Sequence, residues 1–301
     1  MILAPAPAPR RPAESCSALM AAAYRRLATL CPALEVAVCA PGTPAGPGWV
    51  DGTELVGRPG LLDALLADGA DRITAEHGRT PRPDVTASRF LHGHLWSLCL
   101  LLSGPWYLER RVPRLRPEDV RLALRGQGHQ VVPGAFACLP GDPAAGLPGV
   151  RVLSGEREAA EALLHAVAAL ARPLCGALSP RLRRGPRALW GMVEDDLVSG
   201  IWYLGRMLGE EERAVGEAER LLPGPVAPFP AGAAFRWLTD ADGKHHPTRD
   251  RAGCCLYYTL RPAEACATCP RTGDAERLRR IAAEPGPAQA LPSAPDRGGD
   301  S

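Results

Sequence analysis

The sequence predicts a helix-rich α+β protein with a small antiparallel sheet in the middle of the chain and a short irregular C-terminal module. Three observations predict this class. Ala- and Leu-rich stretches with helical spacing fill both halves of the chain, a short central segment alternates apolar and polar residues, and a segment rich in Cys, Gly and Pro follows the last helical stretch. With 301 residues, of which 46% are hydrophobic and 23% charged, the chain is long enough to bury a sizeable core.

Helical patterns dominate the N-terminal third. The first predicted helix begins at Ser15 or Ser17, either of which can act as its N-cap, and ends at Leu30, just before Pro32. Three segments are expected after it: a Gly- and Pro-punctuated loop at 40–60, a short amphipathic helix from Leu61 closed by Gly69, and a long apolar helix over about 84–103.

Strands are expected in the middle of the chain and helices again after it. Residues 119–139 alternate apolar and polar side chains on both sides of a Gly-containing turn, which predicts a β-hairpin, and 149–153 can add a third strand. The helices that follow are expected from Ser154 as N-cap to Pro173, from Pro186 to Gly209, and from Glu210 to Leu222.

These patterns divide the chain into four parts. We expect a disordered N-terminus at 1–14, a helix-rich α+β body at 15–222, a C-terminal module at 223–282 and a disordered tail at 283–301. The two terminal segments are rich in Pro, Gly, Ala and Ser, which cannot build a core. Residues 223–230, PGPVAPFP, are expected to link the body to the C-terminal module.

Charge and hydropathy narrow the function classes. The formal net charge of +2 excludes a strongly basic nucleic-acid binder, so we expect no nucleic-acid partner. No secretory signal is evident, and the apolar run at 89–108 is interrupted by His92, Gly93 and His94, which leaves too little length for a membrane span. We therefore expect a cytoplasmic protein, with peripheral contact to the cytoplasmic face of the inner membrane as an alternative. Cytoplasmic thiols stay reduced, so clustered cysteines indicate metal or redox chemistry sooner than disulfides.

Four cysteines are concentrated near the C-terminus in the pattern C-C-x10-C-x2-C: Cys254, Cys255, Cys266 and Cys269. A set of four thiolates suits either zinc or an iron–sulfur cluster. The adjacent pair converges only if the backbone bends, which Gly253 makes easy. A zinc site usually draws on two spaced pairs, whereas a [2Fe–2S] cluster offers adjacent thiolates two metal atoms. The pattern therefore favours a [2Fe–2S] cofactor held by these four cysteines, with structural zinc and unliganded thiols as alternatives.

The remaining cysteines are scattered among Ala and Leu. Isolated cysteines in such surroundings behave as small apolar residues, so we expect them to be buried and inert. They are Cys16, Cys31, Cys39, Cys99, Cys138 and Cys175.

The cysteine pattern resembles that of the FhuF family of ferric-siderophore reductases, whose [2Fe–2S] cluster is held by the same spacing. The resemblance extends to RAGCCLYY, because the family places an arginine three residues before the first cysteine and a tyrosine shortly after the pair. Here these are Arg251 and Tyr257 or Tyr258, and the resemblance implies that Arg251 and Tyr257 lie beside the cluster. A weaker similarity surrounds Trp190, where the family tends to have asparagine two residues later and this chain has Met192.

The resemblance also implies an activity. Oxygen ligands such as hydroxamates hold ferric iron far more tightly than ferrous iron, so a single electron loosens the chelate. The expected function is one-electron reduction of a ferric siderophore of hydroxamate type, with an external electron donor such as a ferredoxin or a flavin reductase and no catalytic residue beyond the cluster. The alternative is a non-catalytic iron–sulfur or zinc-binding accessory protein of siderophore metabolism. Neither G-x-G-x-x-G nor G-x4-G-K-[ST] occurs, so no nucleotide domain is expected.

The histidines give weaker signals. His92 and His94 are two residues apart on a predicted helix and face different directions, which disfavours a chelating pair. A core or helix-surface position is expected for both. His245 and His246 precede the cysteines by eight residues or more, and we expect them to lie beside the site or on the surface because four thiolates already complete the ligand set.

Three groups of charged residues are open to a structural or a functional interpretation. The approach to the cysteines is basic through Lys244, Arg249 and Arg251, which either stabilise the reduced cluster or are simply solvated. A basic run precedes Trp190, and an acidic triplet follows it; both are expected to face solvent. The basic run is Arg181, Arg183, Arg184 and Arg187, and the triplet is Glu194, Asp195 and Asp196.

Overall fold

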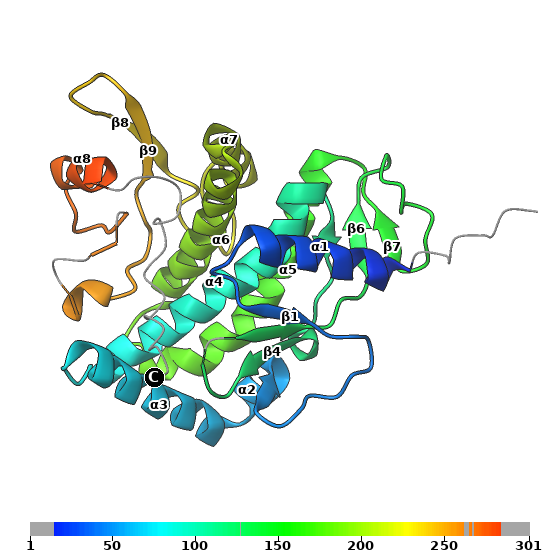
Figure 1. The fold of residues 1–301 in the computed structure, drawn as a ribbon, viewed down its shortest axis with the longest axis horizontal. Coiled ribbons are helices and arrows are strands. Elements are labelled where there is room, and N and C mark those ends of the chain that lie inside the picture. The colour runs from blue at the N-terminus through cyan, green and yellow to red at the C-terminus, as the bar shows by residue number, and fades with distance from the viewer. Residues whose placement is uncertain (1–14, 127, 262–264, 267, 284–301) are drawn as a thin grey trace, which may run out of the picture.

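The computed structural model describes residues 15–126, 128–261, 265–266 and 268–283 (Figure 1). The disorder predicted for 1–14 and 283–301 falls outside these residues except at Ala283, which ends a helix. Helices form the centre of the molecule, small sheets lie on one side of them, and the C-terminal module lies on the opposite side (Figure 1). The predicted helix-rich α+β class is confirmed.

The centre of the fold is helix α4 (Pro83–Glu109), which is buried over most of its length. A helix that is apolar on all sides is stable only where other elements surround it. Four helices do so: α1 (Cys16–Leu30), α3 (Pro59–His77), α5 (Glu156–Leu178) and α6 (Pro186–Leu208). The main apolar core gathers side chains from all five helices.

Three predicted helices are confirmed close to their expected ends. Helix α1 follows Ser15, whose hydroxyl accepts a hydrogen bond from the backbone N–H of Ala18. Helix α6 ends at Gly209, which adopts the left-handed conformation that a C-cap glycine reaches easily. Helix α7 (Glu211–Leu221) follows directly and folds back on α6.

Three helices run past the residues at which we expected them to end. Helix α3 continues through Gly69, α4 through Pro105 and α5 through Pro173. A glycine costs a helix interior about 1 kcal/mol and a proline about 3 kcal/mol. Burial of α4 and α5 outweighs the cost of their prolines, and the cost of a single glycine is small enough for α3 to continue, so the breaker residues alone predicted the wrong ends.

The start of α5 also differs from the prediction. Gly155 rather than Ser154 occupies the N-cap position, and no side chain caps the helix there. The backbone N–H of Ser154 instead donates to the carboxylate of Glu158 in the first turn. The carboxylate of Glu158 therefore accepts from the backbone just before the helix, and the hydroxyl of Ser154 does not cap the helix.

The segment at 40–60 is not a simple loop, as we had expected. It contains strand β2 (Trp49–Asp51) and the short helix α2 (Gly52–Gly57). The carboxylate of Asp51 accepts hydrogen bonds from the backbone N–H groups of Thr53 and Glu54 and so caps α2. A local Asp-Gly-Thr sequence thus starts a helix that the surrounding Gly and Pro residues concealed.

The described strands form three small sheets. Their order is β1 (Val36–Val38), β5 (His129–Val131), β4 (Val120–Ala123) and β2 in the first, β3 (Val112–Pro113), β6 (Phe136–Cys138) and β7 (Val150–Val152) in the second, and β8–β9 in the third. The predicted hairpin is confirmed as the antiparallel pair β4–β5, and the third strand as β7. The sheets of the body are mixed, because β1 joins β5 and β7 joins β6 in parallel. Such pairings between distant segments leave no local pattern in the sequence.

The C-terminal module is a hairpin, a short helix and irregular chain between them. Its elements are β8 (Phe235–Thr239), β9 (His245–Arg249), the 3-10 turn η3 (Tyr257–Thr259) and α8 (Asp274–Ala283); the body has two more such turns, η1 (Pro117–Asp119) and η2 (Ser179–Arg181). The segment predicted to be a linker packs on the body through Phe229, which is 1% exposed. Figure 1 shows the module alongside α6 and the neighbouring part of α4.

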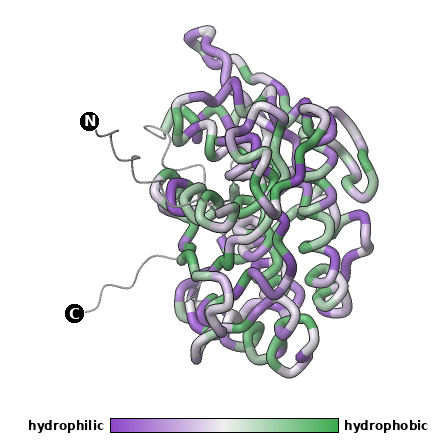
Figure 2. The backbone as a smooth tube through the Cα atoms, turned by 90° about the vertical axis from the view of Figure 1, so that its right-hand side faces the viewer, coloured by the Kyte–Doolittle hydropathy of each residue, from purple (hydrophilic) through white to green (hydrophobic). Residues whose placement is uncertain are grey.

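Hydropathy follows the architecture. Figure 2 shows hydrophobic chain segments in the interior and a hydrophilic hairpin tip at the top of the view. In the described part of the chain, one helical stretch, Glu156–Arg181, is long and apolar enough to cross a membrane by length and composition. Half of the apolar window in that stretch is buried inside the protein, as expected for a core helix.

Candidate iron–sulfur site

The C-terminal cysteines meet in one place. The thiol of Cys266 lies close enough to those of Cys255 and Cys269 for each pair to influence the other's protonation. Cys254 lies close enough for its charge to interact with those of Cys255 and Cys269. Cys255 and Cys269 are buried, whereas Cys254 and Cys266 are half-buried. The C-C-x10-C-x2-C pattern therefore converges into one cluster of thiols.

The thiols perturb one another's protonation. Hydrogen bonding with Cys266 lowers the pKa of Cys255 to about 3 and that of Cys269 to about 6. The pKa of Cys266 rises far above its usual range because it keeps the proton that it shares with both neighbours. Thiolates rather than thiols bind metals. The arrangement therefore favours the form that a metal ligand requires in at least two of these side chains.

Two hydrogen-bond donors point at the sulfur atoms. Nη1 of Arg251 donates to Sγ of Cys266 at 3.7 Å, and the backbone N–H of Leu256 donates to Sγ of Cys254 at 3.4 Å. The side chain of Arg251 is only 5% exposed, and its Nε and Nη2 have no hydrogen-bond partner among the described residues. Burial lowers the pKa of Arg251, but the negative charges of Asp195 and the thiolates raise it by more. The net shift is upward, so the guanidinium stays charged. Hydrogen bonds to sulfur and nearby charge both tune an iron–sulfur centre.

Asp195 on α6 holds the segment that leads into the cysteine pair. Its Oδ1 accepts from Nη2 of Arg249 at 2.7 Å and from the backbone N–H of Ala252 at 3.2 Å. Its Oδ2 accepts from the backbone N–H of Gly253 at 2.6 Å and lies 3.5 Å from Nε of Arg251. The side chains of Asp195 and Arg249 are both 0% exposed. One buried carboxylate thus fixes residues 249–253 against the body.

The expectation that the acidic triplet faces solvent was wrong. Glu194, Asp195 and Asp196 are completely buried, because α4 covers one side of α6 and the C-terminal module covers another. Successive positions on a helix point in different directions, so each acid meets its own partner. Glu194 accepts a hydrogen bond from the backbone N–H of Gly232, and Asp196 Oδ1 lies 2.7 Å from Nδ1 of His92.

The basic approach to the cysteines divides between the two expected roles. Lys244 is exposed at the tip of the β8–β9 hairpin, so it is solvated. Arg249 is buried against Asp195, and Arg251 is buried between Asp195 and the thiol of Cys266. Two of the three cations therefore belong to the site.

The basic run before Trp190 is also divided, and the expectation of a fully solvated run was wrong for two members, Arg181 and Arg184, which are half-buried. Nη1 of Arg184 donates to the backbone carbonyl of Cys254, which ties the start of α6 to the cysteine pair. Arg181 instead pairs with Asp63 on α3. The other two residues of the run, Arg183 and Arg187, are exposed.

Two glycines let α6 and the cysteine segment touch. A Cβ on Gly253 would lie 2.9 Å from Cγ of Met192, and a Cβ on Gly191 would lie 3.0 Å from Cβ of Ala252. Met192 is fully buried at this contact, and its sulfur accepts a hydrogen bond from Arg184 at 3.5 Å. The residue two positions after Trp190 therefore packs on the backbone that carries the cysteine pair.

The other predicted side chains are placed as follows. Tyr257 is buried beside the cysteines, while the hydroxyl of Tyr258 accepts from Arg271 at 3.1 Å nearer the surface. His245 and His246 lie on the hairpin, where His246 Nε2 is 2.7 Å from Asp240. Four of the six scattered cysteines are buried as expected; the two that are only half-buried are Cys16 and Cys39.

His92 and His94 are buried on α4 and face different partners, as their spacing predicts. His92 lies against Asp196, whereas Nδ1 of His94 is 3.3 Å from Nε2 of His129 on β5. Burial lowers the pKa of His94 well below its usual value, and the neighbouring His129 lowers it further. His94 is therefore a neutral interior side chain at neutral pH.

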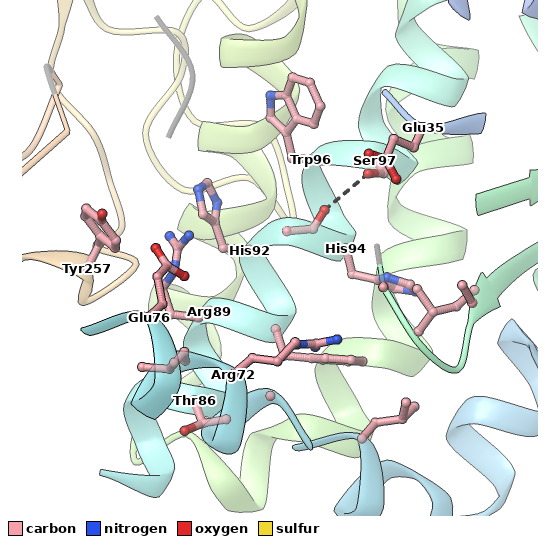
Figure 3. Close-up of a pocket in the computed structure, with 18 of the residues that line it drawn as sticks. Glu35, Arg72, Glu76, Thr86, Arg89, His92, His94, Trp96, Ser97 and Tyr257 are labelled. Atoms are coloured by element: carbon pink, nitrogen blue, oxygen red, sulfur yellow. Dashed lines mark hydrogen bonds between the residues drawn. The ribbon is translucent and has the colours of Figure 1, made fainter. Parts of the chain in front are cut away.

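A cavity of about 390 Å³ adjoins the cysteine site (Figure 3). Residues of α3, α4 and the β4–β5 hairpin line most of it, and Tyr257 and Leu260 of the C-terminal module also line it. The guanidinium carbon of Arg89 lies 4.9 Å from the centre of the Tyr257 ring, and Figure 3 shows His92 next to Arg89. Tyr257 and Leu260 pack in the same small apolar cluster as Cys255. The wall of the cavity and the surroundings of Cys255 therefore share side chains.

The donor set fits an iron–sulfur cluster. Within the described residues, no three His, Cys, Asp or Glu side chains gather in a way that could hold a single metal ion. A [2Fe–2S] cluster does not require such a group, because its four ligands serve two irons. The converging thiols, the N–H groups aimed at sulfur and the unpartnered N–H groups of Arg251 all suit it. Fold and site together define an iron–sulfur protein in which a helical body supports a C-terminal metal centre.

Comparison with known families agrees. Residues 251–271 match the family described as the FhuF 2Fe-2S C-terminal domain. The C-terminal segment is therefore similar to the FhuF 2Fe-2S domain, as the cysteine pattern suggested, and its cofactor is a [2Fe–2S] cluster. All four clustered cysteines fall inside the match, although their assignment as ligands and the boundaries of the four parts of the chain stay predictions. No curated protein matches the chain.

Sequence reasoning missed three residues at or near the site: Asp195, Arg184 and Arg89. For Asp195 a signal was present, because three acids stand between apolar residues in MVEDDLV and two arginines of opposite charge lie just before the cysteines. Charged residues bracketed by apolar ones on a helix are buried only when they are paired. Arg184 and Arg89 gave no comparable local signal.

Proposed function

We propose that the protein is a one-electron reductase of ferric siderophore complexes that releases the iron as Fe(II). The observation that carries the proposal is the adjacency of the thiol cluster and the cavity, whose wall includes side chains packed on Cys255. A chelate in the cavity would lie close to the sulfur atoms, and short separation favours electron transfer. The matching FhuF 2Fe-2S domain supports the same activity.

When bound, the [2Fe–2S] cluster supplies one electron at a time. Hard oxygen ligands hold Fe(III) far more tightly than Fe(II), so the chelate weakens when its iron gains that electron. A single electron passes from the protein to the iron, and no bond forms between protein and chelate. An external one-electron donor, such as a ferredoxin or a flavin reductase, restores the reduced protein. We propose that the reduction takes place in the cytoplasm. The alternative location is the cytoplasmic face of the membrane.

Arg251 adjusts the driving force of this reaction. Its buried guanidinium donates to Cys266 and carries a positive charge beside the thiol cluster. Positive charge stabilises the more negative, reduced state and so raises its reduction potential. For a one-electron couple, about 59 mV changes the equilibrium tenfold. The charge of Arg251 therefore helps to decide which ferric chelates can be reduced.

The lining of the cavity favours a chelate with little net charge. Its fixed charges are those of Arg72 and Arg89 against those of Glu35 and Glu76, which balance. Three hydroxamates carry one negative charge each and neutralise Fe(III), whereas three catecholates leave a strongly anionic complex. A neutral ferric trihydroxamate is therefore the substrate that we propose.

A stoichiometric reduction assay tests the proposal. Cluster-loaded protein is reduced with dithionite, freed of excess reductant and mixed anaerobically with the ferric complex of desferrioxamine E, a cyclic trihydroxamate, in the presence of a ferrous chelator. We expect the visible spectrum of the oxidised protein to return while one Fe(II) is trapped for each cluster oxidised. Protein stripped of its metal is the control and should release none.

Two outcomes would contradict the reductase. If the protein remains reduced, it does not transfer its electron to this class of chelate. If it is oxidised without release of Fe(II), the electron goes elsewhere, and a non-catalytic accessory or sensor role becomes the better account.

A further inference from the structure

We propose that the cavity between α3, α4 and the C-terminal module is the binding site for the ferric chelate, and that Arg89 binds oxygen atoms of that chelate. This inference rests on the proposed reductase function and gives it a location. Most residues that line the cavity belong to the body of the protein, outside the residues that match the FhuF 2Fe-2S domain, and Tyr257 and Leu260 are the lining residues that fall inside that match.

The position of the cavity carries the first step. Val85 on α4, Cys255, Tyr257 and Leu260 form one buried apolar cluster, against which Ile73 of α3 packs. Ile73, Tyr257 and Leu260 also line the cavity. A ligand in the cavity therefore contacts side chains that themselves pack around a predicted ligand of the iron.

Arg89 carries the second step. Its Nη1 is buried and has no hydrogen-bond partner among the described residues, while its guanidinium lies over the ring of Tyr257. A buried donor without an acceptor is unfavourable, and a bound oxygen ligand would remove that penalty. Guanidinium groups suit carboxylate and hydroxamate oxygens because their donors are fixed in one plane. Figure 3 shows Arg89 between Tyr257 and His92.

The remainder of the lining suits a mostly apolar ligand. Phe90 and Trp96 contribute aromatic surface, and Leu65, Leu122 and Leu124 contribute aliphatic surface. Small-molecule sites are commonly apolar with a few polar groups that fix orientation. A trihydroxamate has this character, because hydrocarbon linkers join its few oxygen-bearing groups.

Gly93 provides a direct test of occupancy. It lines the cavity from α4, and a Cβ built there would meet no other atom within 4 Å, so a larger side chain enters open space. We expect Gly93→Leu to weaken binding of the gallium(III) complex of desferrioxamine E by about tenfold or more, measured by calorimetry. Gallium(III) is not reduced under these conditions, so binding is measured apart from electron transfer.

The matched control is Gly176→Leu. Gly176 is exposed on α5, also has open space around its Cβ, and lies outside the cavity lining. We expect this variant to bind the gallium complex like the unaltered protein, and both variants to keep their iron, sulfide and visible spectrum. Unchanged binding in Gly93→Leu would overturn the proposal. So would a failure of the unaltered protein to bind the gallium complex while it still reduces the ferric one.

The role of Arg89 is tested separately. Arg89→Gln removes the charge and most donors, and we expect about tenfold weaker binding of the gallium complex, whereas Arg89→Lys should recover part of the loss. Arg82→Gln is the control, because the side chain of Arg82 is exposed and hydrogen-bonded to Asp84 at the start of the same helix. Equal binding by Arg89→Gln and the unaltered protein would remove Arg89 from the site. Binding without reduction would instead count against the proposed reductase and leave the binding site standing.

Discussion

At the scale of one residue, Asp195 holds in place the backbone that carries the cysteine pair. A vicinal cysteine pair needs a fixed backbone, and the two cysteines themselves do not fix it. Asp195 fixes that backbone, since its two oxygens accept from Arg249, Ala252 and Gly253. The same carboxylate lies beside Arg251, whose guanidinium reaches Cys266. Structure and charge of the metal site thus depend on one buried acid.

Replacement of Asp195 by asparagine is expected to destabilise the protein. Asp195→Asn leaves the guanidinium of Arg249 buried without its counter-charge, and removal of one partner from a buried ion pair costs about 3–5 kcal/mol. Urea unfolding of the metal-free protein measures the loss. Asp63→Asn is the control, because Asp63 is 60% exposed in its pair with Arg181 and such pairs contribute only about 0–1 kcal/mol. Equal losses in the two variants would contradict the central role of Asp195.

The four clustered cysteines are expected to be the ligands of the cluster. Single changes to serine at Cys254, Cys255, Cys266 or Cys269 should each remove most of the iron and acid-labile sulfide, because a hydroxyl replaces a soft thiolate. Cys39→Ser is the control, since Cys39 is half-buried near the sheet and away from the site. Metal and sulfide analysis of the purified proteins measures the effect. Unaltered protein that contains one zinc and no sulfide would contradict the assignment.

At the scale of elements, the site depends on how closely α6 approaches the cysteine segment. Gly191 on the helix and Gly253 on the segment allow backbone and side chains to meet where larger residues would not fit. Arg184 adds a hydrogen bond from the start of the same helix to the carbonyl of Cys254. The helix of the body therefore serves as the support on which the C-terminal thiols are arranged.

Gly253→Ala tests this close approach. The new Cβ would lie 2.9 Å from Cγ and 3.1 Å from the backbone nitrogen of Met192, and the backbone of α6 cannot yield easily. We expect a loss of about 1–3 kcal/mol in the free energy of unfolding and a lower iron content per chain. Gly134→Ala is the control, because a Cβ at Gly134 meets no atom within 4 Å. A variant at Gly253 that holds iron and resists urea as well as the control would show that the contact is not needed.

At the scale of the whole molecule, local sequence signals predicted the fold class and the cysteine cluster better than they predicted contacts between distant segments. Cysteine spacing and helical periodicity are local, so the thiol cluster, α1, α6 and the β4–β5 hairpin could all be anticipated. Breaker residues misled, since the burial of α4 and α5 outweighs Pro105 and Pro173. The parallel pairing of β1 with β5 and the cavity beside Tyr257 bring together distant segments, which periodicity in one sequence cannot reveal.

The burial of Glu194 belongs to this scale as well, because it joins the body to the C-terminal module. Its carboxylate is completely buried and accepts hydrogen bonds from the backbone N–H groups of Ala231 and Gly232, just before β8. Burial raises the pKa of Glu194 to about 7, although these hydrogen bonds lower it again in part. The joint between the two parts of the chain is therefore sensitive to pH.

Glu194→Gln isolates that sensitivity. A carboxyl group whose pKa is higher in the folded than in the unfolded protein stabilises the fold at low pH, and the contribution is lost as pH rises through the folded pKa. From pH 5 to pH 7 the unaltered protein should therefore lose stability steadily relative to Glu194→Gln, and the difference should level off above about pH 7, where the carboxyl group is ionised in both states. Urea unfolding of both proteins at several pH values measures the difference. In the control Glu158→Gln the difference should stay constant over this range, because hydrogen bonding with Ser154 lowers the pKa of Glu158 and moves its titration to more acidic pH. A difference for Glu194→Gln that is equally flat would mean that this carboxylate ionises freely at the joint.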